Sequence, residues 1–518
     1  MSRTDFFEAE PVTPLDGYNR ELLQHVSPAD WQNPTPAPRY DLVVIGAGTA
    51  GLVVAAGAAG LDLGLKVALV ERHLMGGDCL NVGCVPSKCV IQSARIAAQV
   101  RNGQSLGVAP LGPSVNFEAV MERMRQVRSG ISHHDSAQRF RSIGVDVFFG
   151  QGQFLGPGQV QVGDQVLQYK KAVIATGARA VRPDVPGLAE AGFLTNETVF
   201  NLTQAPKRLA VIGGGPIGCE LAQAFQRLGS QVVLLHRGSH VLNKEDANAA
   251  AIVQAQLLDD GMTLILDSQL IQVETTPAGK VITYRTGDRA QGEEQTIVVD
   301  EILVGAGRAP NVEGLNLEAV GVAYDRRGVR VNDYLETTGS NIYAAGDICM
   351  DWKFTHAADA AARIVIKNTL FSPLGFGRYK LSSLVMPWAT YTDPEVAHVG
   401  RYEHELRQQG VRFETIQINF DQVDRALADG ETDGFVKIHY KTGSDQILGA
   451  TIVAKHAGDM ISEITTAIVH KIGLSKLSTV IHPYPTQAEA IKKAADAYRR
   501  TLLTPKTKAF LKFLTRIG

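Results

Sequence analysis

A strand that turns through a glycine-rich loop into a helix occurs twice in this chain, and this repeat constrains the fold more than any other feature. The first copy reads DLVVIGAG, AGLVVAAGAAGL and KVALVE, and the second reads RLAVIGGG, PIGCELAQAFQRLG and QVVLLH. The glycines at G-x-G-x-x-G spacing are Gly46, Gly48 and Gly51 in the first copy and Gly213, Gly215 and Gly218 in the second. Backbone N–H groups and a helix dipole can hold a pyrophosphate at such a loop. Two copies therefore imply two dinucleotides.

The residue that ends the second strand differs between the copies. In the first copy it is Glu71, 20 residues after Gly51, where a carboxylate can bind the ribose hydroxyls of an adenine nucleotide. In the second copy His236 takes the equivalent place and Arg237 follows it. A carboxylate would repel a 2′-phosphate, whereas a guanidinium can pair with it. The second site therefore favours NADPH over NADH, unless Arg237 is only a solvated surface residue.

At 518 residues the chain is longer than one hydrophobic core usually supports. We predict an α/β fold with two Rossmann-like dinucleotide-binding domains and a C-terminal α+β domain, because the region after about residue 380 alternates strands with a helix near 458–472. The six prolines of the first 39 residues indicate an irregular arm. We predict an N-terminal arm at 1–39 and a tail at 505–518. The first dinucleotide domain is predicted in two parts, at 40–182 and at 306–379, and the second part includes a central region. The second dinucleotide domain is predicted at 183–305, and the α+β domain at 380–504.

Composition excludes several classes of protein. The formal net charge of −2 gives no reason to expect nucleic-acid binding. Residues 42–61 carry no charge, but five glycines and the strand-like lead-in argue against a membrane helix. The N-terminus has acids where a signal peptide has a basic start, and five cysteines are too few for a secreted disulfide scaffold, so we expect a cytoplasmic protein.

The segment GGDCLNVGCVPSK holds two cysteines five positions apart, Cys79 and Cys84. Gly83 permits a turn between them, and Pro86 marks the first turn of a helix whose dipole would stabilise a Cys84 thiolate. The alternative is half of a zinc site, but no second pair with ligand spacing accompanies it. We therefore predict a redox-active pair and no resident metal, and we expect Cys89, Cys219 and Cys349 to lie in the core.

These motifs resemble the pyridine nucleotide-disulfide oxidoreductase family, which includes glutathione reductase, dihydrolipoamide dehydrogenase and mercuric reductase. The resemblance covers residues 40 to about 500 and implies bound FAD. By it, Cys79 is the interchange thiol, Cys84 is the charge-transfer thiol, and Lys88 and Glu220 form an ion pair near the reactive nitrogen of the flavin. IATGAR (174–179) and GRAPN (307–311) are similar to secondary fingerprints of the family. The resemblance adds Thr176, Gly177, Lys88 and Asp347 to the FAD site, and Glu220 and Gly307 to the nicotinamide nucleotide site.

The same resemblance implies a homodimer whose C-terminal domain completes the active site of the partner subunit. Here the sequence departs from the usual H-x-H-P-T-x-x-E, because it reads His482-Pro-Tyr484-Pro-Thr-x-x-Glu489. A phenol with a pKa of ~10 is a poor base near neutral pH. Disulfide exchange with glutathione or lipoamide thus loses its expected catalyst. An alternative is that Tyr484 serves only in packing.

The mercuric reductase branch carries Pro-Tyr-x-Thr-x-x-Glu at this place, followed by a lysine and two alanines, as Lys492, Ala494 and Ala495 follow here. However, we expect no GMTCxxC domain before residue 40 and no vicinal cysteines at the C-terminal end. Soft Hg(II) is captured by thiolates, so mercury is not established as the substrate. We predict electron transfer from NADPH through FAD and the Cys79/Cys84 pair to a small acceptor, either a soft metal ion or a disulfide. The alternatives are a dihydrolipoamide dehydrogenase-like enzyme and a non-catalytic flavin-binding sensor.

The tail places Phe510, Phe513, Leu514 and Ile517 at helical spacing, with basic residues on another face. Such a helix either docks on its own protein or lies on an anionic membrane surface. We therefore state peripheral membrane contact through this tail as a hypothesis.

Overall fold

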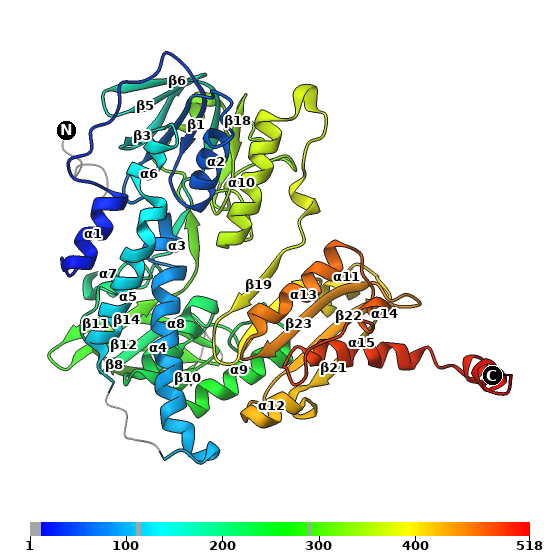
Figure 1. Ribbon diagram of the computed structural model, residues 1–518. Coiled ribbons are helices and arrows are strands. Elements are labelled where there is room, and N and C mark those ends of the chain that lie inside the picture. Colours follow the sequence, from blue (N-terminus) through cyan, green and yellow to red (C-terminus); the bar gives the residue numbers. More distant parts are fainter. Residues whose placement is uncertain (1–11, 110–114, 288–291, 518) are drawn as a thin grey trace.

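The computed structural model describes residues 12–109, 115–287 and 292–517. Residues 1–11 of the predicted arm and Gly518 of the predicted tail lie outside this description. Three sheets organise the chain, and Figure 1 shows the first sheet at the top, the second below it and the third toward the C-terminal end. The predicted fold class, two Rossmann-like units and a C-terminal α+β unit, is confirmed by this arrangement. The predicted domain boundaries remain expectations.

The first sheet is built around β1 (Tyr40–Ile45), which pairs in parallel with β2 (Val67–Glu71) and β6 (Gln165–Ile174). Successive residues of β1 face opposite sides, so the strand reads as a continuous apolar run. Leu42 and Val44 belong to the core under the helices, whereas Val43 and Ile45 belong to the core on the other face. The other strands are β3 (Val145–Phe149), β4 (Gly152–Gly156), β5 (Gln159–Val162) and β18 (Ile342–Ala344).

Helices α2 (Thr49–Ala59) and α10 (Thr355–Leu370) cover the first sheet and pack against each other. Both are rich in alanine, so their backbones approach closely. The uncharged segment 42–61 is thus divided between β1 and α2. Across the described ranges, none of the helices combines the length and the apolar character needed to cross a bilayer.

The second sheet has the parallel order β10-β9-β8-β14, with a separate antiparallel sheet of three strands beside it. Its strands are β8 (Arg208–Ile212), β9 (Gln231–Leu235), β10 (Thr263–Ile265) and β14 (Glu301–Val304), and the added strands are β11 (Ser268–Thr276), β12 (Gly279–Thr286) and β13 (Glu294–Val299). Helices α8 (Pro216–Arg227) and α9 (Ala247–Asp259) connect the parallel strands. This is the second copy of the repeat that the sequence predicts.

The C-terminal unit has an antiparallel sheet in the order β19-β20-β23-β22-β21, covered by helices α13 and α15. The strands are β19 (Pro387–Thr390), β20 (Glu395–Gly400), β21 (Phe413–Asn419), β22 (Phe435–Lys441) and β23 (Ile447–Ala454), and the helices are α13 (Ala457–Val469) and α15 (Glu489–Thr501). Helix α13 covers the stretch near 458–472 where the sequence predicts one.

The predicted arm at 1–39 differs from the expectation, because residues within it form helix α1 (Gly17–Val26). Asp16 caps this helix by accepting a hydrogen bond from the Asn19 amide at 2.8 Å, and Leu22 and Val26 are buried. The prolines that indicated an irregular segment flank the helix and do not interrupt it. Helix α1 packs along α5 (Phe117–Ser132), below the first sheet in the view of Figure 1.

Candidate active site

A single cleft of ≈ 4010 Å³ brings most of the predicted site residues together. Both glycine loops line it, as do the two cysteines of the predicted redox pair. The predicted residues along its wall are Gly46, Gly48, Glu71, Cys79, Cys84, Lys88, Thr176, Gly177, Gly213, Gly215, Glu220, His236, Arg237, Gly307 and Asp347. Gly51 and Gly218 lie behind the wall, and Tyr484 and Glu489 are on the C-terminal unit away from it.

The first glycine loop has the close approaches that a pyrophosphate site needs. Gly46 has a φ of +103°, and a Cβ there would lie 2.4 Å from the Ala175 carbonyl oxygen. A Cβ on Gly51 would lie 1.8 Å from the Gly46 carbonyl oxygen, so this glycine lets α2 pack against β1. Only glycine therefore fits the turn that directs the first amides of α2 into the cleft. This shape suits the diphosphate of FAD.

Glu71 ends β2 at the same edge of the sheet. Its carboxylate accepts hydrogen bonds from the Ala47 amide at 2.7 Å and the His73 amide at 2.8 Å. Burial raises the pKa of this carboxyl group, while the two amides oppose that rise. The side chain is thus fixed beside the glycine loop, where it can accept hydrogen bonds from the ribose of FAD.

The second glycine loop repeats this geometry with a different residue at its edge. Gly213 has a φ of +113°, and a Cβ on Gly218 would lie 1.8 Å from the Gly213 carbonyl oxygen. His236 accepts a hydrogen bond through Nδ1 from the Gly214 amide at 3.0 Å. Burial lowers the pKa of His236, so the ring is neutral near pH 7. Arg237 lines the cleft next to it with an exposed side chain.

The two cysteines lie on consecutive helices, α3 (Gly77–Asn81) and α4 (Cys84–Asn102). Gly83 joins them, and a Cβ there would lie 2.7 Å from the Asp78 carbonyl oxygen, so the turn admits no side chain. Cys84 is the first residue of α4, and its Sγ lies 3.2 Å from the Oγ1 of Thr355, the first residue of α10. Two helix N-termini therefore meet at the Cys84 sulfur.

This arrangement stabilises a thiolate at Cys84. The pKa of Cys84 is lowered to about 6, chiefly because the Cys79 thiol donates a hydrogen bond to it, with further contributions from Thr355 and the Lys88 ammonium. The same hydrogen bond, together with burial, raises the pKa of Cys79 well above its usual value. The two thiols are thus differentiated: Cys84 is the anion and Cys79 stays protonated beside it.

Lys88 stands one turn further along α4 and pairs with Glu220 of α8. Its Nζ lies 2.8 Å from Glu220 Oε2, and the Glu220 side chain is almost buried. Burial alone would lower the pKa of Lys88, but Glu220 raises it on balance. The ring of Tyr391 lies under the same ammonium, with 4.4 Å between Nζ and the ring centroid, and the Tyr391 amide donates to Glu220 Oε1 at 2.9 Å.

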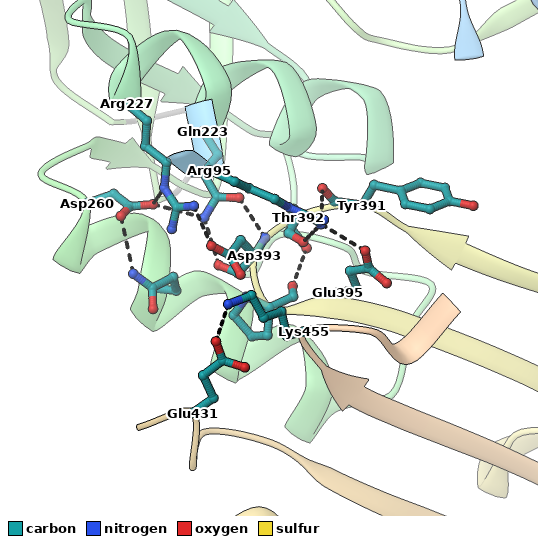
Figure 2. A network of polar contacts seen from close by, with 12 residues as sticks. Arg95, Gln223, Arg227, Asp260, Tyr391, Thr392, Asp393, Glu395, Glu431 and Lys455 are labelled. Atoms are coloured by element: carbon teal, nitrogen blue, oxygen red, sulfur yellow. Dashed lines mark hydrogen bonds and ion pairs between the residues drawn. The ribbon is translucent and has the colours of Figure 1, made fainter. Parts of the chain in front are cut away.

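Tyr391 belongs to the turn after β19, at the start of the C-terminal unit. A polar network fixes this turn against helices α4 and α8 (Figure 2). Arg95 of α4 donates to the Thr392 carbonyl at 3.0 Å and to the Glu395 carboxylate at 2.9 Å. Arg227 of α8 bridges the carboxylates of Asp260 and Asp393 at 2.8 and 2.6 Å. The C-terminal unit is thereby anchored to the helices that carry Lys88 and Glu220.

A third charged group lies beside the cysteines. Arg308 forms ion pairs with Asp78, the residue before Cys79, and with Asp347, whose Oδ2 is 3.4 Å from the guanidinium Nε. Burial raises the pKa of Asp347, and Arg308 opposes that rise. Arg308 therefore links the start of the cysteine turn to Asp347, which the family resemblance assigns to the flavin site.

Tyr484 and Glu489 lie on the far side of the C-terminal unit, outside the cleft of their own chain. Tyr484 is 70% exposed and donates a hydrogen bond to Asp424 at 2.9 Å. That bond raises the pKa of Tyr484, so the phenol stays protonated. The neighbouring His482 is held elsewhere, with Nε2 2.9 Å from Glu463 Oε1. Within one chain the structure does not bring these residues to the cysteines.

Sequence reasoning missed three residues of this site. Thr355 is 271 positions from Cys84, Tyr391 is 171 positions from Glu220, and Arg308 is 230 positions from Asp78. Arg308 stands inside the GRAPN fingerprint, so an arginine next to Gly307 was the available signal. Thr355 and Tyr391 had no such signal. Cys89 and Cys219 are buried as expected, whereas Cys349 is only partly buried.

Comparison with known proteins shows to which family the chain belongs. The sequence family described as pyridine nucleotide-disulphide oxidoreductase matches residues 40–362, and the dimerisation domain of these enzymes matches residues 386–495. The chain belongs to the pyridine nucleotide-disulphide oxidoreductase family.

Similar members of the family include enzymes with different acceptors. A mercuric reductase of Staphylococcus aureus is 33% identical over 457 residues, which cover 88% of this chain and 82% of that protein. A dihydrolipoyl dehydrogenase of Bacillus subtilis (strain 168) is 32% identical over 480 residues, covering 89% and 98%. The Cu(II) complex of the HOCl-induced flavoprotein disulfide reductase RclA from Escherichia coli superimposes with a TM-score of 0.77 at 25% identity, covering 89% and 100%.

Membership of the pyridine nucleotide-disulphide oxidoreductase family confirms several predictions. The chain is a flavin-dependent oxidoreductase that uses FAD and a nicotinamide nucleotide, in the disulfide and metal-ion reductase class. It carries the dimerisation domain of a family of homodimers. The expectation of no resident metal stays a prediction; among the residues that the structure describes, no group of three or more His, Cys, Asp or Glu side chains is arranged to hold a metal ion.

Proposed function

We propose that this chain transfers electrons from NADPH to the Cys79/Cys84 pair and from there to a small acceptor, in the manner of a mercuric reductase. The observation that carries this proposal is the differentiated thiol pair. The pKa of Cys84 is lowered while that of Cys79 is raised, and both line the cleft that the two glycine loops share. A purely structural cysteine pair would not need two helix N-termini and a lysine around one sulfur.

The residues of the chain divide the work. The first glycine loop, Glu71 and Asp347 would hold FAD, which supplies a carrier able to take a hydride from NADPH and pass on its two electrons. Two electrons and one proton, together equal to the hydride of NADPH, would convert the Cys79–Cys84 disulfide into a thiol at Cys79 and a thiolate at Cys84. Cys84 rests as the thiolate beside Lys88, and Cys79 keeps its proton until an acceptor arrives. Two electrons then leave to the acceptor and the disulfide re-forms.

NADPH is the favoured nucleotide because the edge of the second site lacks a carboxylate at the end of β9. His236 is neutral and already accepts a hydrogen bond from the loop, which leaves the exposed Arg237 as the charged group of that edge. Lys244 also lines the cleft. These cations favour a 2′-phosphate.

The partner subunit is proposed to supply Tyr484 and Glu489. Ile481 is 92% exposed and Tyr484 is 70% exposed, so this loop presents apolar surface that a single chain leaves uncovered. Glu489 begins α15, and its Oε2 is buried without a hydrogen-bond partner. Both features support an interface in which a second copy covers the loop and brings a phenol and a carboxylate to the cysteines.

A soft metal ion is the favoured acceptor because the phenol of Tyr484 replaces the base that disulfide exchange requires. The mercuric reductases among the relatives and the Cu(II) complex of RclA support this choice. Dihydrolipoamide is the second candidate, supported by the dihydrolipoyl dehydrogenases of similar identity. The protonated Tyr484 disfavours it, because a phenol with a raised pKa cannot take the proton of an attacking thiol.

The proposal is tested by NADPH oxidation with purified holoenzyme against Hg(II), Cu(II), glutathione disulfide, lipoamide, a quinone and oxygen. We expect the soft metal ions to be reduced fastest and NADH to be the poorer donor. Equal rates for wild type and Cys84→Ala with the preferred acceptor would defeat the mechanism. Faster turnover with lipoamide and NADH would select the dihydrolipoyl dehydrogenase alternative.

We also propose that the C-terminal helix α16 (Pro505–Leu514) binds an anionic membrane surface. No residue of α16 is buried, and Figure 1 shows it extending beyond the rest of the chain. Phe510 and Phe513 are each 59% exposed. After Asp496 the chain has no acidic residue, while its basic residues are Arg499, Arg500, Lys506, Lys508, Lys512 and Arg516. A chain of net charge −2 thus ends in a basic amphipathic helix, which is the pattern of a peripheral anchor.

Flotation with vesicles tests this second proposal. The full chain should float with phosphatidylserine-containing vesicles and much less with neutral ones, and a chain ending at residue 504 should lose this binding. The double variant Phe510→Ser/Phe513→Ser keeps every charge and should also bind weakly. Unchanged flotation after removal of residues 505–518 would sink the proposal.

A further inference from the structure

Helix α1 is held against α5 by polar contacts spread along its length. Asp16 forms an ion pair with Arg125 at 2.6 Å, and Asn19 accepts a hydrogen bond from Arg128 at 2.7 Å. His25, nearly two helical turns after Asn19, has its Nδ1 2.7 Å from the Ser132 hydroxyl oxygen. The match to the oxidoreductase family begins at residue 40, so this helix lies outside the matched region.

One of these contacts continues into the cysteine turn. The guanidinium of Arg128 donates through Nη2 to Asn19 and through Nη1 to the main-chain carbonyl of Asn81 at 2.7 Å. Asn81 stands between Cys79 and Cys84. Arg128 is 2% exposed and Asn19 is 0% exposed, so the bridge is sealed from water. A buried hydrogen bond from a charged donor is among the stronger ones in a protein.

A second contact reaches the start of the same turn. The carbonyl of Val26, the last residue of α1, accepts a hydrogen bond from the Met75 amide at 3.0 Å. The Asn81 side-chain amide in turn donates to the carbonyls of Met75 and Gly77, each at 2.9 Å. The α1 helix therefore contacts the entrance of the cysteine turn directly, through Val26, and its middle indirectly, through the bond from Asn19 to Arg128 of α5.

We propose that α1 is a clamp that positions the Cys79/Cys84 turn, with Arg128 as its positioning residue. The turn starts with Gly76 and Gly77 at φ values of +89° and +57° and closes through Gly83, so its own backbone offers little resistance to rearrangement. Contacts from neighbouring helices must therefore fix the turn, so that the sulfur atoms of Cys79 and Cys84 stay close enough to re-form their disulfide. The redox role of the pair rests on the proposed function, but the clamp itself rests only on these contacts.

Leu22, within α1, and Ser27, the residue after α1, also line the cleft. The clamp thus forms part of the wall of the cleft that the cysteines also line. Its loss should loosen the turn. Because Arg128 also lines the cleft, the FAD content of each variant is measured alongside exchange.

The test compares two ways of weakening α1. Arg128→Met removes both bonds of the bridge, and Asn19→Ala is a milder variant that removes one. The matched control is Asp16→Asn, which breaks the ion pair to Arg125 but keeps an N-cap residue and leaves the bridge to Asn81 intact. Each variant is prepared as FAD-loaded dimer, and hydrogen–deuterium exchange is read by mass spectrometry at the amides of residues 78–83.

We expect exchange in the turn to accelerate by about tenfold in Arg128→Met and by less in Asn19→Ala, as the loss of a buried charged hydrogen bond implies. Asp16→Asn should lower the thermal midpoint while leaving exchange in the turn within about twofold of wild type. A second readout is the pH at which half of Cys84 is alkylated, which should shift in the bridge variants alone.

Equal exchange in the turn for Arg128→Met, Asp16→Asn and wild type would overturn the clamp, and so would acceleration in Arg128→Met with none in Asn19→Ala, because Arg128 belongs to α5. So would equal acceleration in Asp16→Asn and Arg128→Met, because it would reduce α1 to a general stabiliser. The exchange measurement repeated in a Cys84→Ser background requires no turnover. Failure of the proposed electron route therefore leaves this test valid, and the two ideas fail separately.

Discussion

The two sides of the reaction site differ in how completely one chain builds them. On the cysteine side, α4, α8, α10 and the turn after β19 interlock around Cys84 through Thr355, Lys88, Glu220 and Tyr391. On the side of the C-terminal unit, the loop that carries Tyr484 is exposed, and its nearest polar partner is Asp424 on its own surface. One chain thus builds the cysteine side completely, whereas the proposed acceptor side would need the partner subunit.

This difference also separates what can vary from what is constrained. The cysteine side depends on glycines that admit no Cβ and on charges whose removal leaves buried partners. The exposed loop carries no such constraint within its own chain. Under the proposed function, a phenol in place of a base at position 484 would change acceptor chemistry without disturbing the cysteine side.

Among the variants that test this difference between the two sides, Cys84→Ser should have the largest effect on activity. We expect acceptor reduction to fall by at least about 10³-fold, because a hydroxyl cannot form the disulfide or the thiolate. Bound flavin and its reduction by NADPH should persist. Steady-state rates and flavin absorbance under anaerobic NADPH measure both halves.

The control for this prediction is Cys89→Ser. Cys89 follows Lys88 on α4 but is buried in the core that α4 shares with α8, outside the cleft. Its replacement should leave acceptor reduction nearly unchanged. A loss as large as that of Cys84→Ser would mean that the site is simply intolerant of any change in α4.

Mixed dimers sharpen the comparison further. Tyr484→Phe should slow reduction of a soft metal ion by about tenfold or more, since it removes a hydroxyl from the acceptor pocket. A dimer of one Cys84→Ser chain and one Tyr484→Phe chain should keep about half of the wild-type activity. In it, one site has both defects and the other has an intact cysteine pair facing an intact tyrosine.

Tagged chains purified as heterodimers provide the measurement. Activity no higher than half that of the Tyr484→Phe homodimer would place the tyrosine and the cysteines of one chain at the same site. That outcome would contradict the proposed contribution of the partner subunit. Phe in place of Tyr keeps the ring, so loss of packing does not mimic the effect.

The nucleotide that feeds the cysteine side should respond to Arg237. Arg237→Glu places a carboxylate beside the position of a 2′-phosphate and should lower kcat/KM for NADPH by about tenfold or more relative to NADH. Arg237→Gln removes only the attraction and should have a smaller effect. Unchanged discrimination in both variants would show that this arginine is a solvated surface residue.

The smallest predicted effect concerns the charge balance at Cys84. With its pKa lowered to about 6, Cys84 should be the thiol below that pH and the thiolate above it, so alkylation of the reduced enzyme should rise through about pH 6. Lys88→Met removes a cation that lowers this pKa, so the half-point should move up by about one unit. Glu220→Gln removes a charge that raises it and should move the half-point down. Shifts of the same sign in both variants would contradict this electrostatic account.

Sequence patterns predicted the elements whose causes are local. The glycine loops, the strand ends at Glu71 and His236 and the helix that starts at Cys84 follow from steric and dipole effects over a few residues. Helix α1 was missed because its flanking prolines outweighed a short amphipathic segment with an Asp16 cap. The same balance of local signals misleads wherever tertiary contacts stabilise a short helix.

Contacts between distant segments could not be predicted in this way. Thr355 reaches Cys84 because α10 returns to the first sheet, and Tyr391 reaches Lys88 because two arginines anchor its turn. Neither contact can be predicted from the spacing of residues in the sequence. Lys88 and Glu220 were paired only through the resemblance to a family, although the structure now places them 2.8 Å apart.

The most direct test of the electron route is a count of the thiols that NADPH creates. Air-oxidised holoenzyme is incubated anaerobically with or without NADPH, alkylated under denaturing conditions and analysed by peptide mass spectrometry. We predict that Cys79 and Cys84 become alkylated only after NADPH treatment, while Cys89, Cys219 and Cys349 are alkylated equally in both samples. Equal labelling of Cys79 and Cys84 with and without NADPH would contradict the account, because electrons from the nucleotide would then bypass the pair.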